Sequence, residues 1–187
     1  MKVRVEHMGP GDAAQPPFDA VAADVDAMGQ PVGDWSRSLF SQYNFELKKE
    51  ALQQLRMGSN PVSITTLLCP EGAPFKKVLI VVGGDPDRLK QLRFAYDGAI
   101  LAAAADSDIR TLLLPELFCS VPPLVTPDAG SAILTTIYRA FSRDDEALDS
   151  IVLAASSKES AEILTESLDK LMADKVNGIQ NGTSFRL

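Results

Sequence analysis

The chain has 187 residues, of which 45% are hydrophobic, enough for one buried core and therefore one domain. Its formal net charge of −7 argues against nucleic acid as the principal partner, because that affinity comes from clustered lysine and arginine. With a single histidine, two separated cysteines, no signal peptide and no apolar run of bilayer length, we expect a cytoplasmic protein with no metal site, cofactor, disulfide or membrane contact.

Ten secondary-structure elements are predicted from hydrophobic periodicity and from turn and cap signals. In chain order they are strands at 2–7 and 18–25, a helix at 34–57, strands at 61–68 and 77–82, a helix at 85–105, a strand at 109–114, a helix at 126–141, a strand at 151–154 and a helix at 158–172. The first strand alternates apolar and polar side chains, which is typical of a half-exposed sheet edge. The helix at 126–141 has a strong start signal, because Thr126 can cap it and Pro127 and Asp128 suit its first turn.

The central unit of the chain is predicted around two apolar strands joined by a helix. Residues 77–82 form a β-branched apolar run, as expected of a strand that is buried on both faces. Gly83 and Gly84 end this run, and the helix that follows carries one apolar stripe that includes Leu89 and Tyr96. With the second strand at 109–114 this makes a right-handed βαβ unit. Ligands of such sheets bind beyond the carboxyl ends of the strands, so residues 115–126 are a candidate functional loop.

The order of elements predicts an α/β fold: a three-layer α/β/α sandwich around a mixed six-stranded sheet. It is not a plain doubly wound fold, because the first two strands follow each other with no helix between them. We expect one domain over residues 1–173. The segment 174–187 is polar and contains glycine, and it is predicted to be a weakly packed or flexible tail.

The order of elements and several local strings resemble the macro domain, a module that binds ADP-ribose. The resemblance covers roughly Val3 to Met172, and the order of the matches carries it, since each single string is short. The matching strings are Gly11-Asp12-Ala13, Asp19-Ala20-Val21, the strand ending in Gly83-Gly84, the helix Leu89 to Ala105 and the strand Ile109 to Pro115. The resemblance therefore implies a macro-like fold.

Two aspartates acquire expected roles from this resemblance. Asp12 matches the family's aspartate that accepts a hydrogen bond from the adenine amine; its alternative role is that of a solvated turn residue. Asp26 stands in the last place of the family's Asn-Ala-Ala-Asn string, where an asparagine orients the distal ribose. A carboxylate there could hold a ribose hydroxyl or act as the general base, so Asp26 is the candidate catalytic residue, with a strand-ending turn as its alternative role.

The two phosphate-binding loops of the family are rewritten in this sequence. The glycine-rich loop after the second strand keeps only Gly29 and Gly33, and the proline between them offers no N–H group to a diphosphate. The second loop, Ser-Thr-Gly-Val-Phe-Gly in the family, is replaced by a proline-rich segment. Its residues Cys119, Ser120 and Val121 are the candidate ligand contacts, and the alternative role of Cys119 is that of a buried small hydrophobe.

These observations leave two functional hypotheses. The first is a divergent macro-type domain that binds an ADP-ribose-like nucleotide, with at most a weak ADP-ribosyl hydrolase activity. The second is a macro-like fold that has lost its ligand and acts through protein contact, as a neutralising or accessory module, with Val121, Leu124 and Val125 as the exposed apolar contact. A third relation is to the amino-terminal domain of leucyl aminopeptidases, a related macro-like fold that also lacks the phosphate loops.

Overall fold

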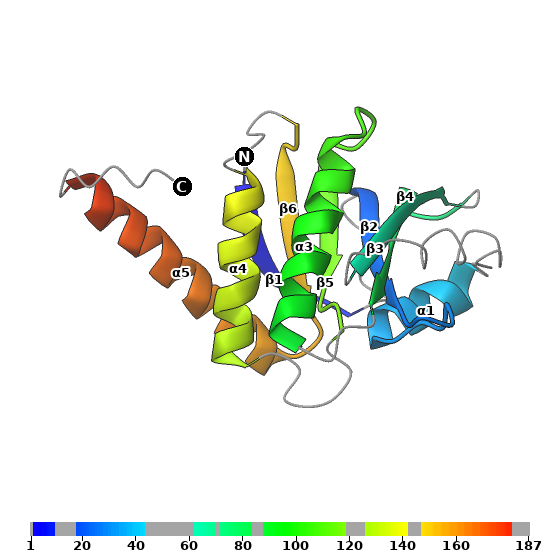
Figure 1. Ribbon diagram of the computed structural model, residues 1–187, viewed down its shortest axis with the longest axis horizontal. Helices are drawn as coiled ribbons and strands as arrows, with labels where there is room; N and C mark the ends of the chain where they lie inside the picture. The colour runs from blue at the N-terminus through cyan, green and yellow to red at the C-terminus, as the bar shows by residue number, and fades with distance from the viewer. Residues whose placement is uncertain are drawn as a thin grey trace.

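A computed structural model describes residues 2–9, 18–43, 62–69, 72–83, 88–118, 126–141 and 147–180 (Figure 1). These residues form six strands and four helices in the predicted order. The elements are β1 (Lys2–His7), β2 (Phe18–Val25), α1 (Asp34–Tyr43), β3 (Val62–Leu68), β4 (Phe75–Gly83), α3 (Arg88–Ala104), β5 (Thr111–Pro115), α4 (Pro127–Phe141), β6 (Ser150–Ala155) and α5 (Lys158–Gln180).

The six strands form one mixed sheet in the order β1-β6-β5-β2-β4-β3. All neighbours are parallel except β3, which pairs with β4 in the antiparallel sense. Strand β1 lies at one edge of the sheet, as its alternating pattern predicts. The apolar strands β2, β4 and β5 lie inside it, which is why they carry few polar side chains. The central unit β4-α3-β5 is confirmed as two parallel-sheet strands joined by a helix, and β2 lies between its two strands.

The helices cover both faces of the sheet, so the predicted three-layer α/β/α architecture is confirmed (Figure 1). Helix α1 packs on one face through Trp35 and Leu39, against the β2 and β4 side chains that point that way. Helices α3, α4 and α5 pack on the other face, where Tyr96 of α3 and Ile133 of α4 are almost fully buried. Because β1, β6, β5, β2 and β4 are parallel to one another, their carboxyl ends all lie at the same edge of the sheet.

Several element boundaries differ from the prediction by a residue or two, and the predicted end of the first helix, at residue 57, lies outside the described residues. Helix α5 does not end at Met172 but continues to Gln180, and it includes Gly178, which costs about 1 kcal/mol relative to alanine in a helix interior. Leu89, predicted on the buried stripe of α3, is 39% exposed because the stripe begins at Leu92. Strand β5 begins at Thr111, two residues later than predicted, and has Pro115 as its last residue. None of the described helices has the length and apolar character that crossing a membrane requires.

Asp19 ties β2 to β5 near the amino end of the sheet. Its Oδ2 accepts hydrogen bonds from the N–H groups of Arg110 (3.0 Å) and Thr111 (2.9 Å) and from the Thr111 hydroxyl (2.9 Å). Its Oδ1 accepts a charged hydrogen bond from Lys76 (2.7 Å). Partial burial raises the pKa of Asp19, but these hydrogen bonds outweigh burial and lower the pKa to about 2. Asp19 is therefore a structural carboxylate at the edge opposite the strand ends.

Candidate functional site

The carboxyl ends of β2, β4, β5 and β6 lie at one edge of the sheet, because these strands are parallel. This edge is where ligands of open α/β sheets bind. Two of the loops that leave the sheet there are the β2–α1 loop, residues 26–33, and the start of the β5–α4 loop, residues 116–118. Together with the strand ends they form what we call the strand-end site.

Asp26, the predicted catalytic residue, opens the β2–α1 loop and organises its turn. Its Oδ1 accepts hydrogen bonds from the N–H groups of Met28 (2.8 Å) and Gln30 (2.9 Å). The Asp26 N–H donates to the carbonyl oxygen of Gln30 (2.8 Å). Gly29 has a φ of 81°, a left-handed conformation that favours glycine. Asp26 thus lies at the strand-end site, with one carboxylate oxygen engaged by its own loop.

Asp24 is the residue at this edge that sequence reasoning misses. The residue is 1% exposed, although it is one of two aspartates in a strand whose other residues are apolar. The N–H of Gly33 donates to Oδ1 (3.3 Å), and the Ser36 hydroxyl donates to the same oxygen. In return, the Asp24 N–H donates to Ser36 Oγ (2.8 Å). The carboxylate therefore fastens the end of β2 to the beginning of α1.

A second loop meets the same carboxylate. The N–H of Phe118 donates to Oδ2 of Asp24 (2.7 Å), across 94 residues of sequence. Phe118 has a φ of 56°, in the left-handed region that non-glycine residues seldom adopt. The loops that follow β2 and β5 are thereby joined at one side chain. The predicted contact Gly33 belongs to the first of these loops, and its amide is engaged by Asp24.

The start of the β5–α4 loop is fixed from two further sides. The Tyr96 hydroxyl of α3 donates to the carbonyl oxygen of Pro115 (2.9 Å) and accepts a hydrogen bond from the N–H of Leu117 (3.2 Å). Glu116 is 6% exposed, and its carboxylate accepts hydrogen bonds from the N–H (3.3 Å) and the hydroxyl (2.6 Å) of Ser156. These contacts hold residues 115–117 against α3 and the end of β6.

Burial raises the pKa of Asp24, while the hydrogen bonds from Ser36, Phe118 and Gly33 act against that rise. These partners of Asp24 are uncharged, so its negative charge is stabilised by hydrogen-bond donors and by no described cation.

The described residues outside this carboxylate offer no reactive thiol. Burial raises the pKa of the free thiol of Cys69 to about 11, which keeps the thiol protonated and unreactive at neutral pH. Among the described residues, no group of three or more His, Cys, Asp or Glu could hold a metal ion.

Several predicted contacts cannot be placed in this geometry. Asp12, Cys119, Ser120 and Val121 lie outside the described residues, as do Leu124 and Val125 of the predicted protein contact. Gly29, Gly33 and Asp26 are described, and all three belong to the β2–α1 loop.

One feature of the sequence could have indicated that Asp24 is buried. It follows Ala20 and Ala22 at the two-residue spacing of a strand, which places a carboxylate on a buried face.

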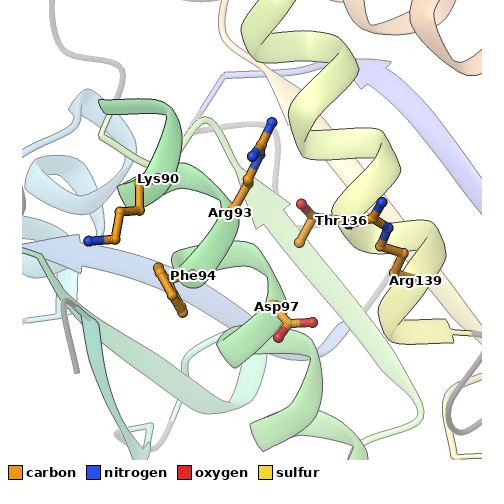
Figure 2. A pocket seen from close by; sticks show the side chains of 6 residues that line it. All are labelled: Lys90, Arg93, Phe94, Asp97, Thr136 and Arg139. Atoms are coloured by element: carbon orange, nitrogen blue, oxygen red, sulfur yellow. The ribbon is translucent and has the colours of Figure 1, made fainter. Parts of the chain in front are cut away.

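A hollow of about 280 Å³ lies elsewhere, on the outer face of α3 and α4 (Figure 2). Three basic side chains and the ring of Phe94 lie around it, and Phe94 is 44% exposed. The hollow is thus rich in basic groups although the protein as a whole is acidic. The residues that line it are Lys90, Arg93, Phe94, Asp97, Thr136 and Arg139. This hollow is a surface feature of two helices and contains none of the predicted site residues.

Among solved structures, the chain resembles the Trypanosoma brucei macrodomain in complex with ADP-ribose, with 16% identity and a TM-score of 0.62 over 88% of this chain and 68% of that one. The chain has the macrodomain fold. The macrodomain fold is also shared with the macro domain of ganglioside induced differentiation associated protein 2, at 20% identity and a TM-score of 0.64, covering 91% of this chain and 82% of that one. An Oceanobacillus iheyensis macrodomain mutant with ADPR gives 15% identity and a TM-score of 0.67, covering 91% and 92%.

The likeness to macrodomains is one of structure. The chain spans about two thirds of the trypanosomal chains, between 65% and 68% of their length. No protein-family model matches the sequence, and no curated protein matches it. At these identities the macrodomain fold is established, and the ligand of this chain is a separate question.

Proposed function

We propose that this protein binds an ADP-ribose-like nucleotide at the strand-end site. The observation that carries the proposal is the pair of hydrogen bonds from Gly33 and Phe118 to the carboxylate of Asp24. Because of them, the loops after β2 and β5 lie together at the carboxyl edge of the sheet. Two structural neighbours of the same fold are complexes with ADP-ribose or ADPR. The position of the two loops supports the proposal, because open α/β sheets bind their ligands beyond the carboxyl ends of the strands.

The β2–α1 loop supplies the ribose side of the proposed site. Asp26 would bind a ribose hydroxyl through its carboxylate, and in any ADP-ribosyl hydrolysis it would serve as the general base that activates water. Gly29 would let the ligand approach the backbone, since it carries no side chain, whereas the space beside Gly33 is taken by the carboxylate of Asp24. Asp12 would accept a hydrogen bond from the adenine amine. Cys119, Ser120 and Val121 would line the diphosphate.

Titration calorimetry with ADP-ribose, up to about 1 mM, tests the proposal. We expect saturable heat and a rise in Tm that grows with ligand concentration. Asp26→Ala is expected to weaken binding about tenfold, which corresponds to one lost hydrogen bond to a charged group. Asp169→Ala removes one exposed carboxylate from α5 and is the matched control, with unchanged affinity. Absence of heat and of a Tm shift for the natural sequence would contradict the proposal.

The second candidate function is protein contact, and the hollow on α3 and α4 favours it. Arg93, Arg139 and Lys90 give this surface basic character on a chain with a net charge of −7, and Phe94 adds an exposed aromatic ring (Figure 2). Arginine and aromatic residues are enriched where protein interfaces carry their binding energy. An acidic segment of a partner suits such a surface. The predicted apolar contact of Val121, Leu124 and Val125 would be a second region of the interface.

A charge-reversal experiment separates this second function from nucleotide binding. Arg93→Glu with Arg139→Glu is expected to abolish binding of an acidic, phenylalanine-containing peptide and to leave ADP-ribose binding unchanged. Binding of the peptide that persists in the double variant would exclude the hollow as its docking site.

A further inference from the structure

The donors around Asp24 form a converging set. Two backbone N–H groups, from Gly33 and Phe118, and the hydroxyl of Ser36 all donate to one carboxylate that is 1% exposed. They come from the β2–α1 loop, from α1 and from the β5–α4 loop. Backbone N–H groups that converge in this way are the usual means by which proteins bind phosphate and carboxylate oxygens. Here the oxygens belong to the chain itself.

We propose that the Gly33 N–H, the Phe118 N–H and the Ser36 hydroxyl form an oxyanion site that the chain fills with its own Asp24 carboxylate. In this arrangement Asp24 is a positioning residue, because its carboxylate is the internal anion that holds the two loops of the strand-end site together. An external oxyanion can use the same donors only when the Asp24 carboxylate is absent.

The backbone around Asp24 is shaped for this contact. A Cβ on Gly33 would lie 3.1 Å from Oδ1 of Asp24, so the missing side chain lets the amide approach the carboxylate. Phe118 adopts its left-handed φ of 56° while its N–H donates to Oδ2 at 2.7 Å. Its ring packs against Gly83, where a Cβ would lie 2.5 Å from two ring carbons. An unfavourable conformation is thus held by a hydrogen bond on one side and by packing on the other.

This arrangement restricts where a phosphate group can bind at the strand-end site, a consequence that rests on the proposed function. The Gly33 and Phe118 amides are engaged by Asp24, and a negative charge lies beside them. Neither of these two amides is therefore available to donate a hydrogen bond to a phosphate group of a bound nucleotide. The diphosphate would have to lie along other residues of the β5–α4 loop, and the β2–α1 loop would contact the sugar.

The test is rescue of Asp24→Ala by formate, a free carboxylate of the size that the substitution removes. Tm is measured in sodium formate and in sodium chloride at equal ionic strength, for the natural sequence, for Asp24→Ala and for the control Asp169→Ala. We expect a lower Tm for Asp24→Ala in chloride, and a formate-dependent rise in Tm that the other two proteins lack, because a ligand that binds the native state stabilises it by mass action. Exchange of the Gly33 and Phe118 amide hydrogens is expected to slow in formate in the same variant.

If Asp24→Ala does not fold in chloride, formate is expected to restore its far-UV circular dichroism in a saturable way. Ser36→Ala removes one donor and keeps the carboxylate, so it is expected to fold and to show no rescue by formate. An Asp24→Ala protein that responds equally to formate and chloride, folded or unfolded, overturns the inference. A natural sequence that fails to bind ADP-ribose contradicts the proposed function and leaves the formate result standing, so the two failures are distinguishable.

Discussion

The ring of Phe118 occupies the space beside the last residue of β4, Gly83. A Cβ built on Gly83 would lie 2.5 Å from two carbons of the Phe118 ring and 2.1 Å from Nε2 of Gln91. The end of β4 and the start of the β5–α4 loop are therefore packed in direct contact. The amide of Phe118 meanwhile donates to Asp24 of β2. Three neighbouring segments at the strand ends thus depend on the position of one phenylalanine.

Gly83→Ala is expected to lower the free energy of unfolding by about 1 to 3 kcal/mol, because the added methyl group must displace the Phe118 ring and the Gln91 side chain. Chemical denaturation measures the change. The control is a double-mutant cycle with Phe118→Ala, in which removal of the ring should relieve part of the cost. Equal costs in both backgrounds would mean that the Gly83–Phe118 contact is not tight in solution.

Ser36→Ala is expected to lower the free energy of unfolding by about 1 to 3 kcal/mol. The hydroxyl both donates to Oδ1 of Asp24 and accepts from the Asp24 N–H, so its loss leaves two buried polar groups with one partner fewer. Ser38→Ala, a half-buried position two residues along α1, is the matched control and should change stability by less than about 0.5 kcal/mol. Similar losses for the two variants would remove the special role of Ser36.

The pH dependence of Asp19 has a definite sign. Its pKa in the folded state is lowered to about 2 from an ordinary value of 3.8, so its stabilising contribution is present above about pH 4 and is lost as pH falls toward 2. Asp19→Asn should therefore cost roughly 1 to 2 kcal/mol at neutral pH, allowing for solvent screening, and little near pH 2. Unfolding free energies across this range test the claim. A cost that does not change with pH would contradict it.

Asp24, on the same strand, has the opposite dependence. Burial raises its pKa above the ordinary value of 3.8, so the unfolded chain loses this proton before the folded chain does. The part of the stability that depends on the proton of Asp24 is therefore fully present below about pH 4 and is lost as pH rises through the raised pKa. The difference in unfolding free energy between the natural sequence and Asp24→Asn should accordingly decrease with rising pH. A difference that grows with pH would show that the hydrogen bonds outweigh burial.

Much of the fold follows from local sequence signals. The second strand has the bounds that its composition predicts, Phe18–Val25, and the Thr126 hydroxyl accepts a hydrogen bond from the N–H of Ala129 (3.3 Å), as expected of a helix cap. Both features depend on neighbouring residues, and both are confirmed. The end of α5 is less well predicted, since the segment after Met172, which contains Gly178 and is expected to be a tail, forms helix as far as Gln180.

The strand-end site is harder to predict because its contacts are long-range. Sequence reasoning points to Asp26, which stands at the strand end, whereas the carboxylate that joins the two loops is Asp24, two residues earlier. Its burial becomes favourable only with donors from Gly33, Ser36 and Phe118, and Phe118 is 94 residues away. No local spacing indicates that these groups meet. The insertion of β2 between β4 and β5 brings them together.

The most direct test of ligand binding at the strand ends is the set of backbone amide shifts in a ¹⁵N-labelled sample titrated with ADP-ribose. We expect saturable shifts of the Asp26, Gly33 and Phe118 amides, with α5 amides such as Asp169 unchanged. A spectrum in which these three amides stay in place, or in which the shifts fall on Phe94 and Arg139 instead, would contradict this expectation.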